Sequence, residues 1–230
     1  MSHRQTVAIL AFLPFFSSFL ATPPASAAPL PPPDLRAQFW TDLDGIPQEG
    51  EEYPVSDREA SRRLLEEAAW VFAGMIDGFD FEWVPESKGR QIVERFALVP
   101  TGTVPAGDRR MLPGEALRDW SRMSAWVEFR PDEADLRALE TSRGSAWKSA
   151  QGIGAVGLTK GWPGRREAYV AAVRAGIEAW ARSMEPNRPR LIRGRVVFSA
   201  VPSLAIVDGS YTVQARIRLE ALEVLRWSIW

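Results

Sequence analysis

The sequence predicts an α+β fold, with helices packed on antiparallel sheet, and three observations carry that prediction. Residues 56–77 and 163–184 place apolar side chains at helical spacing. Residues 211–219 alternate apolar and polar side chains, which is the period of a half-buried strand. With 230 residues and 46% hydrophobic content, the chain is long enough for one medium domain or two small ones.

The N-terminal residues 1–28 are typical of a secretory signal peptide. Arg4 supplies a positive start, residues 7–20 form a short apolar segment, and small residues precede cleavage after Ala27 or Ala28. The apolar segment is short for a membrane span, which needs about 20 residues. We therefore expect an exported protein, periplasmic or secreted, with no stable membrane span after cleavage. Retention of the segment as an anchor is the alternative.

The composition excludes several kinds of chemistry. The chain has no cysteine, and its one histidine, His3, lies in the signal segment. The mature chain would therefore lack serine–histidine and cysteine–histidine catalysis, the usual zinc sites and histidine-ligated haem. We expect no cofactor and no metal. Without Arg4, 27 basic residues face 29 acidic ones and form no basic stripe, so a nucleic-acid partner is not expected.

The first half of the mature chain divides into a leader and a folded unit. Residues 29–53 form a proline-rich and then acidic leader. Residues 54–130 then read as helix, strand, strand and a connection. A capping box of Ser56 and Glu59 begins the helix, and Gly78 ends it. The predicted strands are residues 79–83 and 91–99, with a short helix at residues 114–123 and a strand at residues 125–129.

The second half repeats the order helix, strand, strand after an additional helix and strand. In residues 131–230 we expect a helix from Pro131 to Glu140, a glycine-containing strand at residues 147–158 and the long helix. Strands then follow at residues 193–201 and 211–219, separated by a turn at Asp208 and Gly209. The two units suggest an internal repeat. They could also pack together, so that residues 54–230 form one compact domain.

Tryptophan is the most unusual feature of the composition. The chain contains ten tryptophans, which either fill the core or stack on a ligand such as a sugar. Those within predicted helices are assigned to the core. Trp162 and Trp230 fall in a predicted loop and at the terminus, so these two are the candidate ligand-binding residues.

A glycan-cleaving enzyme is the alternative to a binding protein. Glu140 precedes the segment Gly154-Ala155-Val156-Gly157-Leu158, an order that resembles the lysozyme-like transglycosylases. The resemblance implies that Glu140 would be the catalytic acid, which would need an apolar pocket to raise its pKa. Thr159 and Lys160 replace the Met-Gln that usually follows, and the chain after them is rich in strands.

A second resemblance covers residues 147–222. Gly152-Ile153-Gly154 opens it, an alanine-rich helix follows, and the turn at Asp208 and Gly209 leads into the last strand. This arrangement resembles the N-terminal domain of flagellar assembly protein T and related envelope lipoproteins, although the lipoprotein cysteine is absent. The resemblance implies a non-catalytic envelope protein that docks on other proteins. We therefore expect a non-enzymatic envelope protein whose partner is a protein, a glycan or another ligand.

Overall fold

The predicted α+β class is confirmed by a computed structural model that describes residues 35–45, 53–184 and 188–227. Within these ranges the helices are α1 (Asp57–Ile76), α2 (Glu133–Thr141) and α3 (Gly161–Met184). The strands are β1 (Arg36–Asp42), β2 (Phe79–Val84), β3 (Arg95–Pro100), β4 (Met111–Arg118), β5 (Arg122–Phe129), β6 (Lys148–Gly157), β7 (Leu191–Phe198), β8 (Ser203–Val207) and β9 (Ser210–Leu225).

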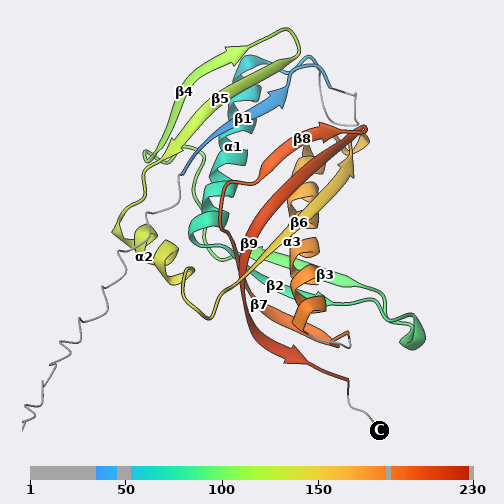
Figure 1. Ribbon diagram of the computed structural model, residues 1–230. Helices are drawn as coiled ribbons and strands as arrows, with labels where there is room; N and C mark the ends of the chain where they lie inside the picture. Colours follow the sequence, from blue (N-terminus) through green and yellow to red (C-terminus); the bar gives the residue numbers. More distant parts are fainter. Residues whose placement is uncertain (1–34, 46–52, 185–187, 228–230) are drawn as a thin grey trace, which may run out of the picture. The chain divides into compact units, whose positions relative to one another are not determined.

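These strands form two antiparallel sheets (Figure 1). The smaller sheet has the order β1-β5-β4, and the larger has the order β3-β2-β7-β9-β6, with β8 also pairing with β9. Strand β2 pairs with β7, so strands from both predicted helix–strand–strand units lie in the same sheet. Contacts group Pro32–Trp230 into one compact unit.

Helix α1 is defined at both ends by local signals. The Ser56 hydroxyl accepts a hydrogen bond from the backbone nitrogen of Glu59 at 3.3 Å, so the predicted N-cap is confirmed. The Glu59 carboxylate instead accepts hydrogen bonds from Arg62 and Arg63. Gly78 follows the helix with a φ of +74°, a conformation that favours glycine and lets the chain turn directly into β2.

Helix α1 joins the two sheets through its aromatic side chains. Phe72 packs against Phe39 of β1, with ring centroids 5.8 Å apart, and therefore anchors the helix to the small sheet. Two residues earlier, on the opposite side of the helix, Trp70 packs against Phe79 of β2 at 4.9 Å and Phe198 of β7 at 5.7 Å. Because α1 packs against both sheets, a single hydrophobic core cluster includes residues from each of them.

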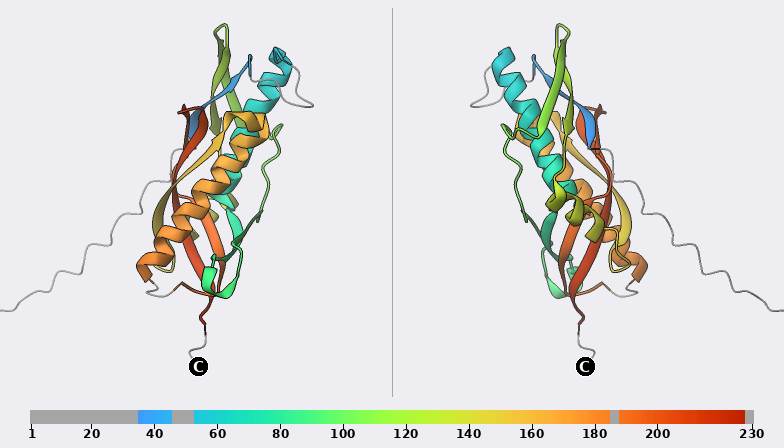
Figure 2. Two further views of the ribbon diagram at one scale, coloured as in Figure 1. Left: turned by 90° about the vertical axis from the view of Figure 1, so that its right-hand side faces the viewer. Right: turned by 90° about the vertical axis from the view of Figure 1, so that its left-hand side faces the viewer.

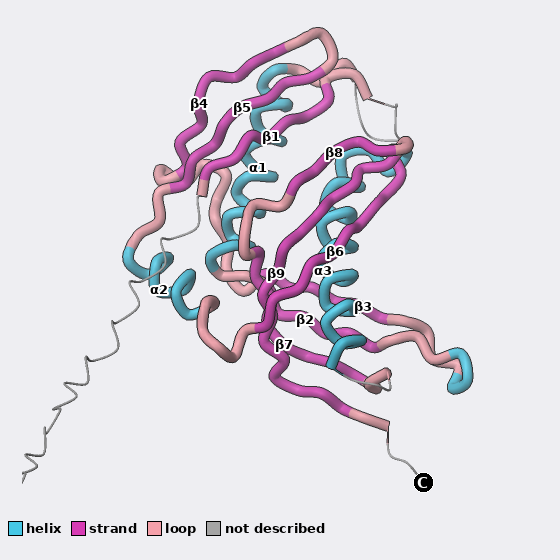
Figure 3. Tube along the Cα trace, in the orientation of Figure 1, coloured by secondary structure: helices cyan, strands magenta, loops and turns pink. Residues whose placement is uncertain are grey.

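Helix α3 covers the face of the large sheet formed by β6 and β9 (Figure 3). The glycines of β6 allow the helix to approach very closely. A Cβ atom on Gly152 would lie 2.0 Å from the carbonyl oxygen of Ala172, and one on Gly154 would lie 2.3 Å from the Ala172 nitrogen. The helix backbone therefore rests on the strand backbone, which only glycine permits here.

The alternation predicted for residues 211–219 is confirmed in β9. Its apolar members are 0–7% exposed, because they face the core beneath α3. Asp208 and Gly209 have φ angles of +48° and +70° and form the predicted turn between β8 and β9. Strand β8 was not predicted from the sequence; it begins directly after Pro202, a residue that is unfavourable inside a strand.

The predicted helix at residues 114–123 is wrong. Residues 111–118 form β4, and a tight turn leads into β5, which begins at Arg122. Beyond Met111, β4 has little burial on either face, so its sequence lacks the alternation that marks a strand. Backbone pairing with β5 outweighs the local helix propensity of this segment.

The predicted leader also contains structure that the sequence did not suggest. Residues 36–42 form β1, which pairs with β5 and buries Phe39. Strand β3 begins at Arg95, later than the predicted start at residue 91. The signal segment 1–28 and Trp230 lie outside the described residues. Among the described helices, none is long and apolar enough to cross a membrane.

Candidate functional site

A buried ion pair lies where α1, α3 and β1 meet. The Arg165 guanidinium donates from Nε and Nη2 to one carboxylate oxygen of Glu67, at 3.0 and 2.7 Å. The Tyr169 hydroxyl donates to the other oxygen at 2.7 Å, and Arg165 Nη2 also reaches the backbone oxygen of Trp40 at 2.6 Å. The side chains of Arg165 and Glu67 are 3% and 7% exposed. Such a pair is costly to break, because either partner alone would be a buried charge.

Aromatic rings enclose the same guanidinium. The Arg165 Cζ atom lies 4.1 Å from the ring centroid of Trp40, 5.0 Å from that of Trp162 and 5.5 Å from that of Tyr211. Its Nη1 atom is sealed from solvent and has no hydrogen-bond partner in the described structure. Burial and the neighbouring Glu67 charge raise the pKa of Tyr169 well above its ordinary value, so its hydroxyl stays protonated and donates. We call this cluster of Arg165, Glu67, Tyr169 and Trp40 the joint, because its contacts link α3, α1 and β1.

Beside this joint, an open groove runs along the part of α1 between Glu66 and Ala73. It has a volume of about 250 Å³, and its walls are mostly apolar. Its floor is formed by α1, its far wall by the irregular segment after β3, and one end by Arg166 of α3. The lining residues are Glu66, Ala69, Trp70, Ala73, Pro100, Gly102, Thr103, Val104, Ala106 and Arg166.

Two charged side chains meet at the end of the groove nearest α3. The Arg166 guanidinium lies 4.2 Å from the ring centroid of Trp70, and desolvation lowers its pKa. Glu66 is held by Arg62 at 2.5 Å. A smaller cavity of about 60 Å³ shares Glu66 and Arg166 with the groove and extends towards Trp162. The two spaces therefore meet at Arg166.

The structure places the three sequence-predicted site residues differently. Trp162 is partly buried in the first turn of α3, lines the smaller cavity and lies 5.3 Å from the Arg63 guanidinium. Trp230 is outside the described residues. Glu140 lies near the end of α2 with 66% of its side chain exposed, pairs loosely with Arg143 at 3.9 Å and lines neither cavity. Of the two candidates that the structure describes, Trp162 lies close to the groove and Glu140 does not.

Sequence reasoning missed Arg166 and assigned Trp70 to the core alone. A signal for Arg166 was available, because no acidic residue stands three or four positions away from it on α3. By contrast, Arg182 on the same helix binds Glu178 at 2.6 Å. An arginine that lacks an intrahelical partner is a candidate for an interaction elsewhere.

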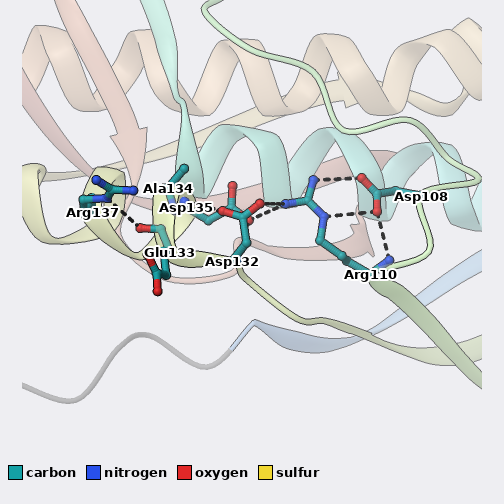
Figure 4. A network of polar contacts seen from close by, with 7 residues as sticks. All are labelled: Asp108, Arg110, Asp132, Glu133, Ala134, Asp135 and Arg137. Atoms are coloured by element: carbon teal, nitrogen blue, oxygen red, sulfur yellow. Dashed lines mark hydrogen bonds and ion pairs between the residues drawn. The ribbon is translucent and has the colours of Figure 1, made fainter.

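A second polar cluster surrounds Arg110 at the start of α2 (Figure 4). Its guanidinium binds Asp108 at 2.8 Å, Asp132 at 2.8 Å and Asp135 at 2.6 Å, and so ties the segment before β4 to the helix. Hydrogen bonds from Arg110 lower the pKa of Asp108 to about 2. Arg110 thus engages all three acids and offsets part of their charge, and the described residues contain no group of side chains suited to hold a metal ion.

The fold and the groove define an α+β protein with a space for a small ligand. A protein-family model that carries no functional description matches residues 32–227, and the chain belongs to that family. The chain is similar to an uncharacterised protein of Treponema pallidum (strain Nichols), with 21% identity over 197 residues, which cover 85% of this chain and 83% of the relative. No solved structure matches the chain significantly. The resemblance to flagellar assembly protein T stays a prediction.

Proposed function

We propose that the chain is an exported bacterial envelope protein that binds a small ligand in the groove along α1, without catalysing a reaction. The groove itself carries the proposal. It combines apolar walls with few charged groups, as ligand sites commonly do. Its floor is a helix held rigidly between two sheets, which suits a preformed site.

The chemistry near the groove supports binding over catalysis. Glu67 is the buried acid closest to it, and both of its carboxylate oxygens already accept hydrogen bonds from Arg165 and Tyr169. A general acid or base must be able to exchange its proton with a reacting group. Glu67 has no carboxylate oxygen left for such an exchange, because both are hydrogen-bonded within the joint. The mature chain would offer no histidine or cysteine in its place.

Export rests on the signal-like residues 1–28 and can be tested directly. Mass spectrometry of the protein recovered from the cell envelope should give an N-terminus at Ala28 or Pro29. Recovery of the chain from the cytoplasm with Met1 or Ser2 at its N-terminus would contradict export.

Ligand binding is tested by thermal unfolding of the exported protein with a library of small neutral, cationic and anionic compounds. A ligand that binds the folded state raises the unfolding temperature. Ala73 lines the groove, and Ala73→Leu would fill it. We expect some compounds to raise the unfolding temperature of the wild type but not of Ala73→Leu. Stabilisation that is equal in both proteins would argue against the groove, and so would the absence of any stabilising compound.

A protein partner is a second candidate, and the hairpin of β4 and β5 supports it. Strand β4 is a largely exposed edge, and Trp120 at the hairpin turn is 86% exposed. Exposed tryptophan is enriched in binding surfaces. A pull-down from envelope extract should then recover a protein with the wild type and lose it with Trp120→Ser. Equal recovery with both would contradict this role.

The glycan-cleaving alternative gains no support from the position of Glu140. Its exposed carboxylate lacks the apolar enclosure that a catalytic acid needs. Glu140→Gln tests it, because the substitution should abolish release of glycan fragments if Glu140 is the acid. Unchanged release, or none by the wild type, would remove this alternative.

A further inference from the structure

We propose that the ligand of the α1 groove is a small amphipathic anion, with its charged group on Arg166 and its apolar body against Trp70 and Ala73. This inference rests on the proposed function and specifies its ligand. The class follows from three features of the groove, namely an arginine that forms no ion pair among the described residues, its apolar walls and its volume.

Arg166 is the charged side chain of the groove that has no ion-pair partner among the described residues. Glu66 pairs with Arg62 at 2.5 Å, and Arg62 also pairs with Glu59, whereas Arg166 is attracted by Glu66 and Glu67 only at longer range. The close neighbour of Arg166 is the Trp70 ring. A cation over a ring is attracted by the ring electrons, which leaves guanidinium N–H donors for another group. A carboxylate or a similar oxyanion is the natural acceptor for such donors.

The walls of the groove require an apolar body next to that anion. Ala69, Ala73 and Val104 contribute only hydrocarbon, and Trp70 contributes a ring face. Trp70 is fixed by packing on Phe79, so it offers a rigid surface with little loss of entropy on binding. A purely inorganic anion would leave these walls uncovered.

The volume limits the size of the ligand. About 250 Å³ equals the space of about eight water molecules in the liquid, at ~30 Å³ each. That is below the usual range of ~300–1,000 Å³ for sites of drug-sized molecules. A compact aromatic or branched carboxylate fits this space. A long acyl chain or a polypeptide segment would extend beyond it.

The test compares a charged compound with its neutral isostere. Isothermal titration of the exported protein would use 2-naphthoate, 2-naphthamide and acetate. We expect 2-naphthoate to bind at one site, 2-naphthamide at least tenfold more weakly and acetate not measurably. Arg166→Gln should weaken 2-naphthoate at least tenfold and leave 2-naphthamide unchanged. Arg174→Gln is the matched control, because Arg174 lies on the same helix, pairs with Glu94 at 2.7 Å and does not line the groove.

The outcomes separate the ligand class from the site. If both naphthyl compounds bind equally and Arg166→Gln changes neither, the anion is refuted but the groove still binds ligands. If Arg174→Gln weakens 2-naphthoate as much as Arg166→Gln does, the effect is one of general charge and the assignment to Arg166 is overturned. If neither naphthyl compound binds at about 1 mM, near the weakest affinity such titrations measure, both the inference and the groove are overturned.

Discussion

Helices α1 and α3 both present small residues, yet one face is closed and the other is open. Beneath α3, Gly152 and Gly154 let the backbone of β6 touch the helix backbone. Along α1, Ala69 and Ala73 face a groove of about 250 Å³. The helices run beside each other (Figure 2), and the Tyr169 and Trp70 rings are 5.4 Å apart, so the contrast arises within one packed structure.

The covering element explains the difference. A strand supplies a regular backbone with side chains on alternate sides, and it can follow a helix closely for several turns. The segment over α1 that follows β3, residues 101–106, is irregular and includes Gly102 and Pro105, so it makes no continuous layer. Small residues on a helix therefore indicate close packing only where a regular element lies over them.

The largest effect is expected at the closed face. Gly154→Val would force a side chain into backbone that lies 2.3 Å from the Cβ position, and neither backbone can move without separating α3 from β6. We expect destabilisation of more than about 4 kcal/mol, or failure to fold. Urea unfolding would measure this, with Gly157→Ala as the control, because its Cβ would lie 3.6 Å from the nearest neighbour. A fold that tolerates Gly154→Val would refute the closed interface.

The joint between the two helices should give the next largest effect. Glu67→Gln leaves Arg165 buried without its counter-charge, and we expect a loss of about 3–5 kcal/mol in the free energy of unfolding. Glu82→Gln is the matched control. It removes an exposed pair with Arg193 and should cost less than about 1 kcal/mol. Similar losses in the two variants would mean that burial of the joint has no energetic consequence.

Two adjacent positions on α1 sharpen the comparison between core and groove. A Cβ on Gly74 would lie 2.7 Å from the rings of Phe79 and Phe198, so Gly74→Ala should cost about 1–3 kcal/mol through overpacking. Ala73 is only 5% exposed but borders the groove, so the larger side chain of Ala73→Leu has space there and should cost less stability than Gly74→Ala. Thermal or chemical unfolding of both variants checks this order. A greater loss of stability in Ala73→Leu than in Gly74→Ala would contradict it.

The smallest effect is expected from the exposed start of α1. Hydrogen bonds from Arg62 hold the pKa of Glu59 at about 2, against 4.5 for an unperturbed glutamate. The stability contributed by this ionised carboxylate is complete above pH 4.5 and is lost as the pH falls towards 2. Because the side chain is one-third exposed, the contribution should be below about 1 kcal/mol. Glu59→Gln should flatten this part of the stability profile, and an unchanged profile would contradict the assignment.

The sequence predicted the elements whose environments differ strongly between their two faces. Strand β9 buries Tyr211 and Ile217 and exposes Gln214, so apolar and polar residues alternate visibly in its sequence. Strand β4 has little burial on either face, and the sequence therefore indicated a helix. Strand β1 was missed because its partner β5 lies about 86 residues away in the chain, as in the pair Phe39 and Ala125.

The candidate site was less predictable than the fold. Trp162 is a sequence-predicted candidate because it falls in a predicted loop, and it does line the cavity next to the groove. Trp70 and Arg166 come from different helices and meet only in the folded chain. The groove also depends on an irregular segment, and neither hydrophobic periodicity nor motif spacing predicts how such a segment packs.

Native mass spectrometry of the protein recovered from the cell envelope tests the central claim most directly. The claim is that the open face of α1 holds a small anionic ligand. We predict that the wild type carries a bound small molecule, which proves to be an acid on release. The same molecule should be absent from Ala73→Leu and depleted in Arg166→Gln, while both variants remain folded. A wild type without bound molecule, or one that Ala73→Leu retains in full, would contradict the claim.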